Sequence, residues 1–382
     1  MSRSLAGMPR ASDQVLTAAQ MRASEAALLA RGTSVEELMQ RAGRGAAEWV
    51  WRMAGGRSVT VLCGPGNNGG DGWVIAEAIR EKGGDVAVVM AAEPATPAAQ
   101  DARARYGGAV IGPDAVRRGE VFVDCLFGTG LTRELVTDHV ALLTALAQSH
   151  HKRVAIDLPS GIETDLGQPL NQGLPDFDLT LALGAWKPAH FLMPASASMG
   201  ALRLVGIGVE LVKGAAVTIA EPRFKAPAPD AHKYTRGLLG VVGGAMPGAA
   251  TLAATAAQGA GAGYVKLYGS VPVCTPPDLV CDSQPLAEAL LDKRIAALLV
   301  GPGLGRDGAA REALAVVLSE QRPTVIDADA LLLLAPRLLA EHFAPLIATP
   351  HEGELSSLER AFALDGLGSK TERALVLART AR

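Results

Sequence analysis

The first half of the chain alternates short apolar runs with longer stretches of helical periodicity. Helices are predicted at 15–31 and 34–53, and Ser34 followed by Glu37 forms a capping-box pattern at the start of the second. The apolar runs predict strands at 58–63, 85–90, 121–128, 153–161, 178–184 and 201–208. Apolar runs of this length that alternate with helical stretches are typical of a mostly parallel sheet with helices on both faces.

The alternation stops at 221–234 and then restarts. This segment, EPRFKAPAPDAHKY, carries three prolines and little periodicity, so it is predicted to be a linker. Further strands are predicted within 236–244, 264–270, 293–303, 322–329 and 345–354, with a small-residue helix at 248–262. We therefore expect an α/β protein with two three-layer αβα domains, at 12–218 and 235–382, joined by a linker at 219–234.

Composition and charge narrow the classes of partner. The formal net charge is −3, so nothing indicates a surface for nucleic acid or acidic lipid. No apolar run is long enough to span a membrane, and the N-terminus lacks the apolar region of a signal peptide. The four cysteines, Cys63, Cys125, Cys274 and Cys281, show no metal-binding spacing. We expect a cytoplasmic protein whose cysteines are free thiols.

The segment CGPGNNGGDG, residues 63–72, lies between a predicted strand and a helix expected from about Gly72. Four glycines would let the backbone take positive φ and approach a ligand closely: Gly66, Gly69, Gly70 and Gly72. The N-terminus of the helix would favour phosphate. Asp71 fits better as an N-cap, or as an acceptor for a ribose hydroxyl or a cation. The alternative is a tight Gly/Asn turn, and the departure from GxGxxG argues against a standard dinucleotide site.

Carboxylates recur at the ends of the predicted strands. Asp124 precedes a second glycine turn, which carries Thr129, Thr132 and Arg133, and Asp157 precedes a Pro-Ser-Gly turn. Three carboxylates are thus expected at successive strand ends: Asp71, Asp124 and Asp157. Oxygen ligands without a Cys/His set suit a hard cation.

Lys187 follows a fourth strand, in the segment GAWKPAH. Most lysines are solvated surface residues, and Lys187 could be one of them. Beside Asp157, it could instead act as an acid/base partner or hold a charged group of a substrate.

Four segments of the first half resemble, in order, the motifs of the NAD(P)H-hydrate epimerase domain: GPGNNGGDGWVIA, VDCLFGTGLTRE, VAIDLPSGIETDLG and LALGAWKPAH. The resemblance covers about 12–215 and implies a Rossmann-like domain that interconverts the R and S forms of hydrated NADH and NADPH. It implies that the hydrate contacts Asn67, Asn68, Gly69, Gly70, Asp71, Gly128, Thr129, Gly130, Leu131, Thr132, Arg133, Glu134 and Asp157. It further implies that potassium binds at Asn68, Asp124 and Ser160. The family's epimerase domains are often dimeric, which suggests a homo-oligomer.

The chemistry of the hydrate is consistent with this resemblance. C6 of the hydrated nicotinamide ring is bonded to both N1 and a hydroxyl group. The N1 lone pair can expel the hydroxyl as water if an acid protonates it, and water that returns to the other face gives the epimer. We hypothesise that Asp157 is the general acid and base, with assistance from Lys187.

Segments of the second half resemble the NAD(P)H-hydrate dehydratase family, which has a ribokinase-like fold: RGLLGVVGGAMPG, LLVGPGLGRD, TVIDADALLLLA and IATPHEGELSSL. The resemblance implies that ADP or ATP is used to remove water from the S hydrate. It implies that the hydrate contacts Ala245, Gly248, Gly303 and His351. Taken alone, His351 is more typical of a surface or helix-capping histidine.

The sequence departs from the dehydratase family near its end. The family continues past TPHEGE to a GSGDVL-like motif that supplies the catalytic base and a turn for the nucleotide phosphates, and no such string occurs in the 382 residues. The sequence instead ends with the Lys/Arg-rich segment SKTERALVLARTAR, which is predicted to be helical. We therefore expect a truncated dehydratase domain with impaired activity and with a sheet edge or apolar face left uncovered.

Two other functions fit parts of the pattern. A nucleotide-binding or sensing module would use the same glycine turns without chemistry, and the presence of Asp157 and Lys187 argues against it. A small-molecule kinase of the ribokinase type would fit the second half. Phosphoryl transfer needs a phosphate clamp and a base. The missing glycine-aspartate motif would supply both, so its absence argues against a kinase.

Overall fold

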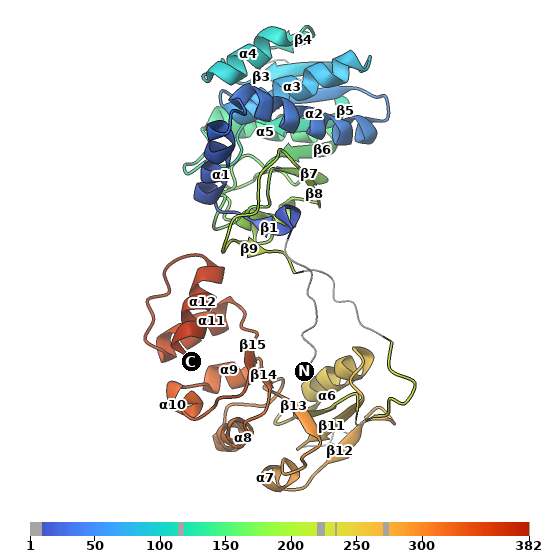
Figure 1. The fold of residues 1–382 in the computed structure, drawn as a ribbon, viewed down its shortest axis with the longest axis vertical. Helices are drawn as coiled ribbons and strands as arrows, with labels where there is room; N and C mark the ends of the chain where they lie inside the picture. The colour runs from blue at the N-terminus through green and yellow to red at the C-terminus, as the bar shows by residue number, and fades with distance from the viewer. Residues whose placement is uncertain (1–9, 114–117, 220–225, 234, 270–274, 382) are drawn as a thin grey trace. The chain divides into compact units, whose positions relative to one another are not determined.

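The computed structural model describes residues 10–113, 118–219, 226–233, 235–269 and 275–381. The chain divides into two compact units, Met1–Glu221 and Pro222–Arg382 (Figure 1). Each is an α/β unit built on a parallel sheet, as the alternation of apolar runs predicted. Within the described residues, no helix is both long and apolar enough to cross a bilayer.

The first unit contains a seven-stranded sheet in the order β4-β3-β2-β5-β6-β7-β8. Every neighbouring pair in it is parallel. Its strands are β2 (Val59–Cys63), β3 (Val86–Met90), β4 (Ala109–Ile111), β5 (Gly119–Cys125), β6 (His150–Ile156), β7 (Leu179–Leu183) and β8 (Ala201–Val205). A separate antiparallel pair joins β1 (Gln14–Val15) to β9 (Ala216–Val217). The apolar pattern predicted all of these strands except β1, β4 and β9, which are two or three residues long.

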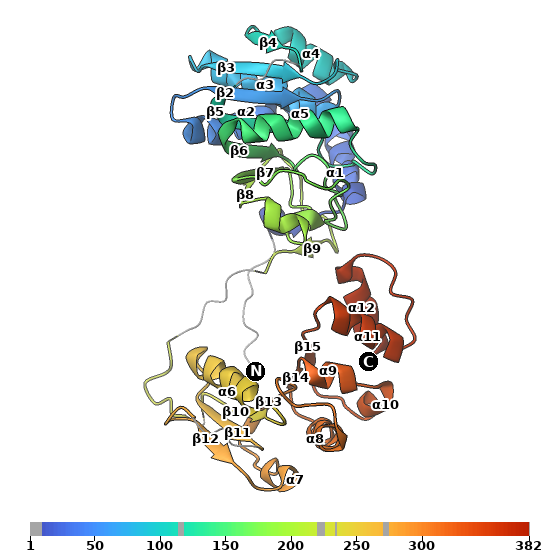
Figure 2. The same ribbon diagram turned by 180° about the vertical axis from the view of Figure 1, so that it is seen from behind.

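Helices cover both faces of this sheet because successive strand residues point to opposite sides. Val59, Val61 and Cys63 of β2 pack in the core beneath α2 and α3, whereas Leu62 packs in the core beneath α5. Figures 1 and 2 show these two helix layers from opposite sides. The helices are α1 (Ala18–Ala30), α2 (Val35–Ala54), α3 (Asn67–Glu81), α4 (Pro97–Arg105) and α5 (Thr137–Gln148), with 3-10 turns η1 (Ala11–Asp13), η2 (Pro188–His190) and η3 (Ala195–Ser198).

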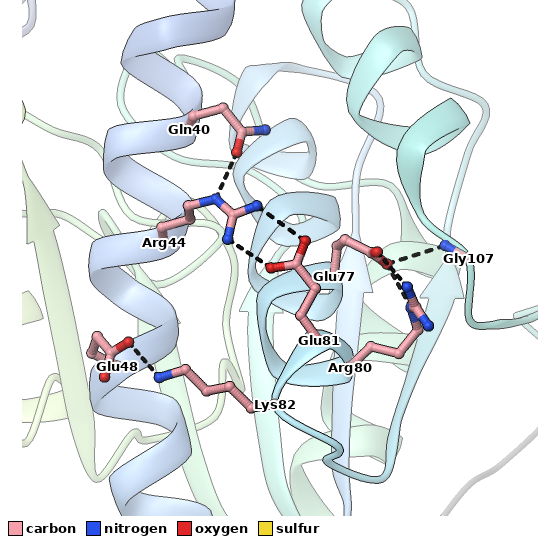
Figure 3. Close-up of polar contacts among 8 residues, drawn as sticks. All are labelled: Gln40, Arg44, Glu48, Glu77, Arg80, Glu81, Lys82 and Gly107. Carbon is pink, nitrogen blue, oxygen red and sulfur yellow. Dashed lines mark hydrogen bonds and ion pairs between the residues drawn. The ribbon is translucent and has the colours of Figure 1, made fainter.

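Charged pairs join the solvent side of α2 to α3 (Figure 3). The Arg44 guanidinium donates to both carboxylate oxygens of Glu81 at 2.8 and 3.2 Å, and Lys82 pairs with Glu48. Ser34 caps α2 by accepting from the N–H of Glu37, as predicted, but the Glu37 side chain pairs with Arg41 and does not complete a capping box. Because the charged side chains that join α2 to α3 are largely exposed, each of these pairs contributes little to the packing of the two helices.

The glycine-rich segment differs from the sequence-based expectation, because α3 begins at Asn67 rather than near Gly72. None of Gly66, Gly69, Gly70 and Gly72 has a positive φ. At Gly69, an added Cβ would lie 1.9 Å from the carbonyl oxygen of Gly64, and at Gly72 it would lie 2.7 Å from the Cys63 sulfur. Gly69 and Gly72 are therefore required for close packing of α3 on the sheet, not for a flexible turn.

The second unit contains a six-stranded parallel sheet in the order β12-β11-β10-β13-β14-β15. Its strands are β10 (Leu238–Val242), β11 (Tyr264–Tyr268), β12 (Val280–Asp282), β13 (Ile295–Val300), β14 (Thr324–Ile326) and β15 (Leu346–Ala348). Its helices are α6 (Pro247–Gly259), α7 (Leu286–Ala289), α8 (Gly308–Ser319), α9 (Asp329–Leu333), α10 (Pro336–Leu339), α11 (Glu352–Ala361) and α12 (Lys370–Thr380). The small-residue helix α6 and the helical end of the chain, α12, were both predicted.

Large apolar side chains are exposed in β15, the edge strand of this sheet, and near the end of the chain. Ile347 is 60% exposed, and Leu367 and Leu375, which precede and lie in α12, are also exposed. The expectation of an edge or face left uncovered by a missing segment stays a prediction.

Candidate active site

A cavity of about 570 Å³ lies at the carboxyl ends of the central strands of the first unit. The segments that follow β2, β5 and β6 form its floor, and helices α1 and α2 form its other walls. Ligand sites in open parallel sheets occur at this edge. The helical walls contribute Met21, Arg22, Glu25, Leu29, Val35, Leu38, Met39 and Ala42.

A buried ion pair lies on the floor of the cavity. Asp157 follows β6 in the left-handed region, with φ 66°, and is 6% exposed, while Lys187 is 1% exposed. The Lys187 ammonium donates to the Asp157 carboxylate and, at 2.6 Å, to the Leu183 carbonyl. Thr129 donates to the other Asp157 oxygen from its hydroxyl and from its N–H, the latter at 3.0 Å. Lys187 is therefore not the solvated surface residue of the alternative interpretation.

The electrostatics of the floor keep Asp157 ionised. Burial raises the pKa of Asp157, but the Lys187 charge and the hydrogen bonds from Lys187 and Thr129 outweigh it and hold the pKa below its usual value. An ionised carboxylate can accept a proton, whereas a proton donor must come from elsewhere in the site.

His190, which was not predicted as a site residue, hydrogen-bonds to the backbone of both members of this ion pair. Its Nδ1 accepts from the Lys187 N–H at 2.8 Å, so Nε2 carries the ring proton and donates to the Asp157 carbonyl at 2.8 Å. Burial and the Lys187 charge lower the pKa of His190 to about 4. The ring is therefore neutral and holds the backbone of both Asp157 and Lys187. The one signal in the sequence is its position three residues after Lys187.

Asp71 lies in the second turn of α3, so it is neither an N-cap nor at a strand end, contrary to expectation. It still lines the cavity. Burial raises its pKa well above the usual value, and the negative charges of Asp157 and Glu25 add to the rise. Within the described part of the chain, no hydrogen bond reaches its carboxyl group.

The three residues predicted to hold potassium meet around the 126–128 segment. Asp124 is fully buried and accepts from the Ser160 hydroxyl at 2.7 Å and the Ser160 N–H at 2.8 Å. Ser160 in turn accepts from the Phe127 N–H at 2.9 Å. Asn68 lies against the other side of this segment, since a Cβ added at Gly128 would lie 3.0 Å from its amide carbon.

The donor set is of the kind that binds a hard cation. Both polar atoms of the Asn68 amide are buried without a hydrogen-bond partner in the described structure. Such atoms are costly unless a ligand, ion or water satisfies them. Burial raises the pKa of Asp124 to about 6, which reflects a carboxyl group with no cationic side chain to compensate it. Carboxylate, amide and hydroxyl oxygens are ligands for a hard cation.

The other predicted hydrate contacts separate into two groups. Those that line the cavity are Asn67, Asn68, Asp71, Gly128, Thr129, Gly130, Leu131 and Asp157. Those that do not are Gly69, Gly70, Thr132, Arg133 and Glu134. Gly69 and Gly70 pack α3 on its neighbours, and Glu134 lines a different cavity beside Asn171.

Helix α1 contributes two charged residues that the sequence analysis did not single out. Arg22 and Glu25 line the cavity with Met21 and Leu29, because residues at this spacing share one face of a helix. Burial raises the pKa of Glu25, and the charges of Lys187, Asp157 and Arg22 also act on it. No pattern around the segment MRASEAALLA announces a site; only its position against the strand ends does.

In the second unit, the glycine turns that carry Ala245 and Gly303 lie against each other. The Ala245 N–H donates to the Leu304 carbonyl at 3.2 Å, and a Cβ added at Gly303 would lie 2.3 Å from the Met246 carbonyl. Gly248 follows in the first turn of α6. His351 caps α11 through its Nδ1 and is 72% exposed.

Comparisons with known proteins agree with this division of the chain. A family described as YjeF-related protein N-terminus matches residues 35–189, and one described as NAD(P)H-hydrate dehydratase matches residues 239–380. Helix α1 lies outside both matched ranges.

Full-length relatives match both units together. The chain is 32% identical to a bifunctional NAD(P)H-hydrate repair enzyme of Synechocystis sp., a match that covers 90% of this chain and 72% of the relative. It is 34% identical to a Coxiella burnetii protein of the same name, covering 94% of this chain and 80% of the relative. A solved ADP/ATP-dependent NAD(P)H-hydrate dehydratase from Bacillus subtilis is 30% identical over 34% of this chain and 50% of its own, with a TM-score of 0.29.

Proposed function

Because the chain belongs to the family of bifunctional NAD(P)H-hydrate repair enzymes, we propose that its first unit interconverts the R and S hydrates of NADH and NADPH, with Asp157 and Lys187 as its catalytic residues. The buried Asp157–Lys187 ion pair on the cavity floor carries the proposal. Desolvated titratable groups of opposite charge in a cleft are typical of acid–base sites. The epimerase domain would extend over 12–218, with a linker at 219–234.

The hydrate would lie with its nicotinamide ring over Asp157. The hydroxyl group leaves C6 as water while the N1 lone pair forms the C6=N1 double bond, and water then adds to the other face of the ring. Asp157 is ionised in the free site, so it would accept the proton of the adding water on its side. The Lys187 ammonium would hold that carboxylate in place and offset its charge.

The dinucleotide phosphates would bind where α3 begins. Asn67 and Asn68 form the first turn of α3, and no side chain caps this terminus. Free N–H groups at a helix N-terminus favour anions. The turn from Gly128 to Leu131 would contact the rest of the hydrate. A potassium ion held by Asn68, Asp124 and Ser160 would supply positive charge beneath the same turn.

The second unit would act on the S hydrate with ADP or ATP, through Ala245, Gly248, Gly303 and His351. Its 235–382 segment contains no GSGDVL-like string. We propose that a polypeptide of these 382 residues has impaired dehydratase activity, because it lacks that motif's base and phosphate turn. Incubation with the S hydrate and ADP, followed by NADH absorbance, tests this part independently.

The epimerase is tested with the separated R hydrate of NADH in potassium buffer, with the S form followed by chromatography. Wild type should convert it far above the uncatalysed rate, and Asp157→Asn should lose about 10²- to 10⁴-fold of that rate. Full activity in Asp157→Asn would contradict the assignment. Unchanged circular dichroism of the variant shows that the loss is chemical.

A further inference from the structure

Inversion at C6 places a requirement on the site that one carboxylate does not meet. Water leaves from one face of the nicotinamide ring and adds to the other, so a proton must be given on one face and taken on the other. The enzyme works in both directions, which requires a group on each face that can do either. Asp157 and Lys187 lie together on the floor and serve one face.

Helix α1 supplies a carboxyl group from a different wall of the cavity. Glu25 lines the cavity, and its neighbours on the same helical face, Met21 and Leu29, are apolar. No hydrogen bond or ion pair engages the Glu25 carboxyl group in the described part of the chain. A planar ring held between α1 and the strand ends would therefore have one carboxyl group on each side.

We propose that Glu25 is the second acid–base residue of the epimerase site and serves the ring face opposite Asp157. This inference rests on the proposed epimerase function and adds a catalytic residue to it. Glu25 gives its proton to the hydroxyl leaving C6, which departs as water as the C6=N1 bond forms. Water then adds from the floor side and gives its proton to Asp157. The reverse reaction exchanges the two roles.

The charges around the two carboxyl groups suit these roles. Glu25 faces Lys187, Asp157 and Asp71 across the cavity and Arg22 on its own helix. Burial raises the pKa of Glu25, whereas the Lys187 contact outweighs burial at Asp157 and lowers its pKa. Glu25 thus retains its proton to higher pH than Asp157 does. Two carboxyl groups with pKa values pushed apart by their surroundings are typical of an acid and a base in one site.

The test separates the two faces with water labelled with oxygen-18. Each purified hydrate epimer is incubated with the full chain in labelled water, and both epimerisation and label uptake into the starting epimer are measured. Glu25→Gln should lose about 10²-fold or more of epimerisation. It should still exchange label into the epimer whose hydroxyl faces Asp157, because on that face the Lys187 ammonium can supply the departing proton through Asp157 and take it back when water returns, without Glu25.

Ser24→Ala is the matched control, because Ser24 neighbours Glu25 on α1 but donates to the Gln20 carbonyl, away from the cavity. It should epimerise and exchange like wild type. Epimerisation at the wild-type rate in Glu25→Gln would overturn the inference. So would a variant that binds the hydrate normally but loses epimerisation and label exchange equally in both epimers. Wild type that neither epimerises nor exchanges would refute the proposed function itself, and the inference with it.

Discussion

The two units place polar residues at the carboxyl ends of parallel strands, but they leave them in different states. In the second unit, Asp329 is paired with the exposed Arg306 at 2.7 Å, and Asp327 accepts from Thr349 at 2.8 Å. In the first unit, the ion pair of Asp157 and Lys187 is shut away from solvent. Strand-end acids alone therefore do not identify a site.

What distinguishes the first unit is that polar groups with missing or fully desolvated partners gather around one cavity, whereas Tyr268 and His342 of the second unit, which also carry buried polar atoms without a partner among the described residues, do not line that cavity. The Asn68 amide has no hydrogen-bond partner among the residues that the structure describes, and Glu25 and Asp71 line the cavity with raised pKa values. Buried polar groups are normally satisfied, so a cluster of exceptions that lines a cavity indicates a place for a ligand. Substitutions that act on desolvation should therefore affect the first unit more than the second.

The largest difference in stability between the two units is expected when the cation of each ion pair is replaced by methionine. Lys187→Met leaves the Asp157 carboxylate buried without its cation, which should lower the free energy of unfolding of the first unit by about 3–5 kcal/mol. Arg306→Met removes a side chain that is 65% exposed, so water replaces it and the second unit should lose at most about 1 kcal/mol.

The two units can be measured separately. All four tryptophans, Trp49, Trp51, Trp73 and Trp186, lie in the first unit, so fluorescence in urea reports that unit. Hydrogen exchange of peptides from the second unit reports the other. Similar losses in the two variants would refute the comparison.

A smaller effect should appear in the pH dependence of stability. The pKa of His190 is lowered to about 4, whereas an unfolded histidine titrates near 6.5, so the unfolded chain binds the extra proton between these values. This contribution is complete above about pH 6.5 and is lost as the pH falls towards about 4, at a cost of about 3 kcal/mol.

His190→Gln isolates this contribution, because Gln cannot take up the proton. The free energy of unfolding from tryptophan fluorescence should fall more steeply in wild type than in the variant between pH 6.5 and 4. Parallel curves would show that His190 is not held neutral by its surroundings.

The same contrast explains which features the sequence predicted. The apolar runs predicted the longer strands and the main helices because burial on two faces is a local pattern. Asp157 and Lys187 were predicted because each follows a strand. The start of α3 was not predicted, because four glycines in the seven residues 66–72 are typical of a loop. In the structure, Gly69 is required by the close approach of Gly64, and Gly72 by the cysteines of β2 and β5. Long-range contacts also determine the importance of Glu25, which no local pattern indicates, and of His190, whose one local signal is its position three residues after Lys187.

The smallest expected effect is that of potassium, and it should be confined to the first unit. A cation that binds the native state stabilises it by about 1.4 kcal/mol at ten times its dissociation constant. Potassium should therefore stabilise the first unit relative to lithium at equal ionic strength, in a fluorescence-monitored urea titration. Asn68→Ala should abolish the difference, since it removes a donor whose atoms lack other partners.

Asn67→Ala is the matched control for that experiment. Asn67 is the neighbouring amide, but it is exposed and its oxygen accepts from the Thr96 hydroxyl at 2.7 Å. This variant should retain the potassium dependence. If it lost the dependence as Asn68→Ala does, the effect would come from the helix N-terminus in general. If wild type were equally stable in both salts, the buried Asn68 amide would need another ligand, and the proposed hydrate would be the next to test.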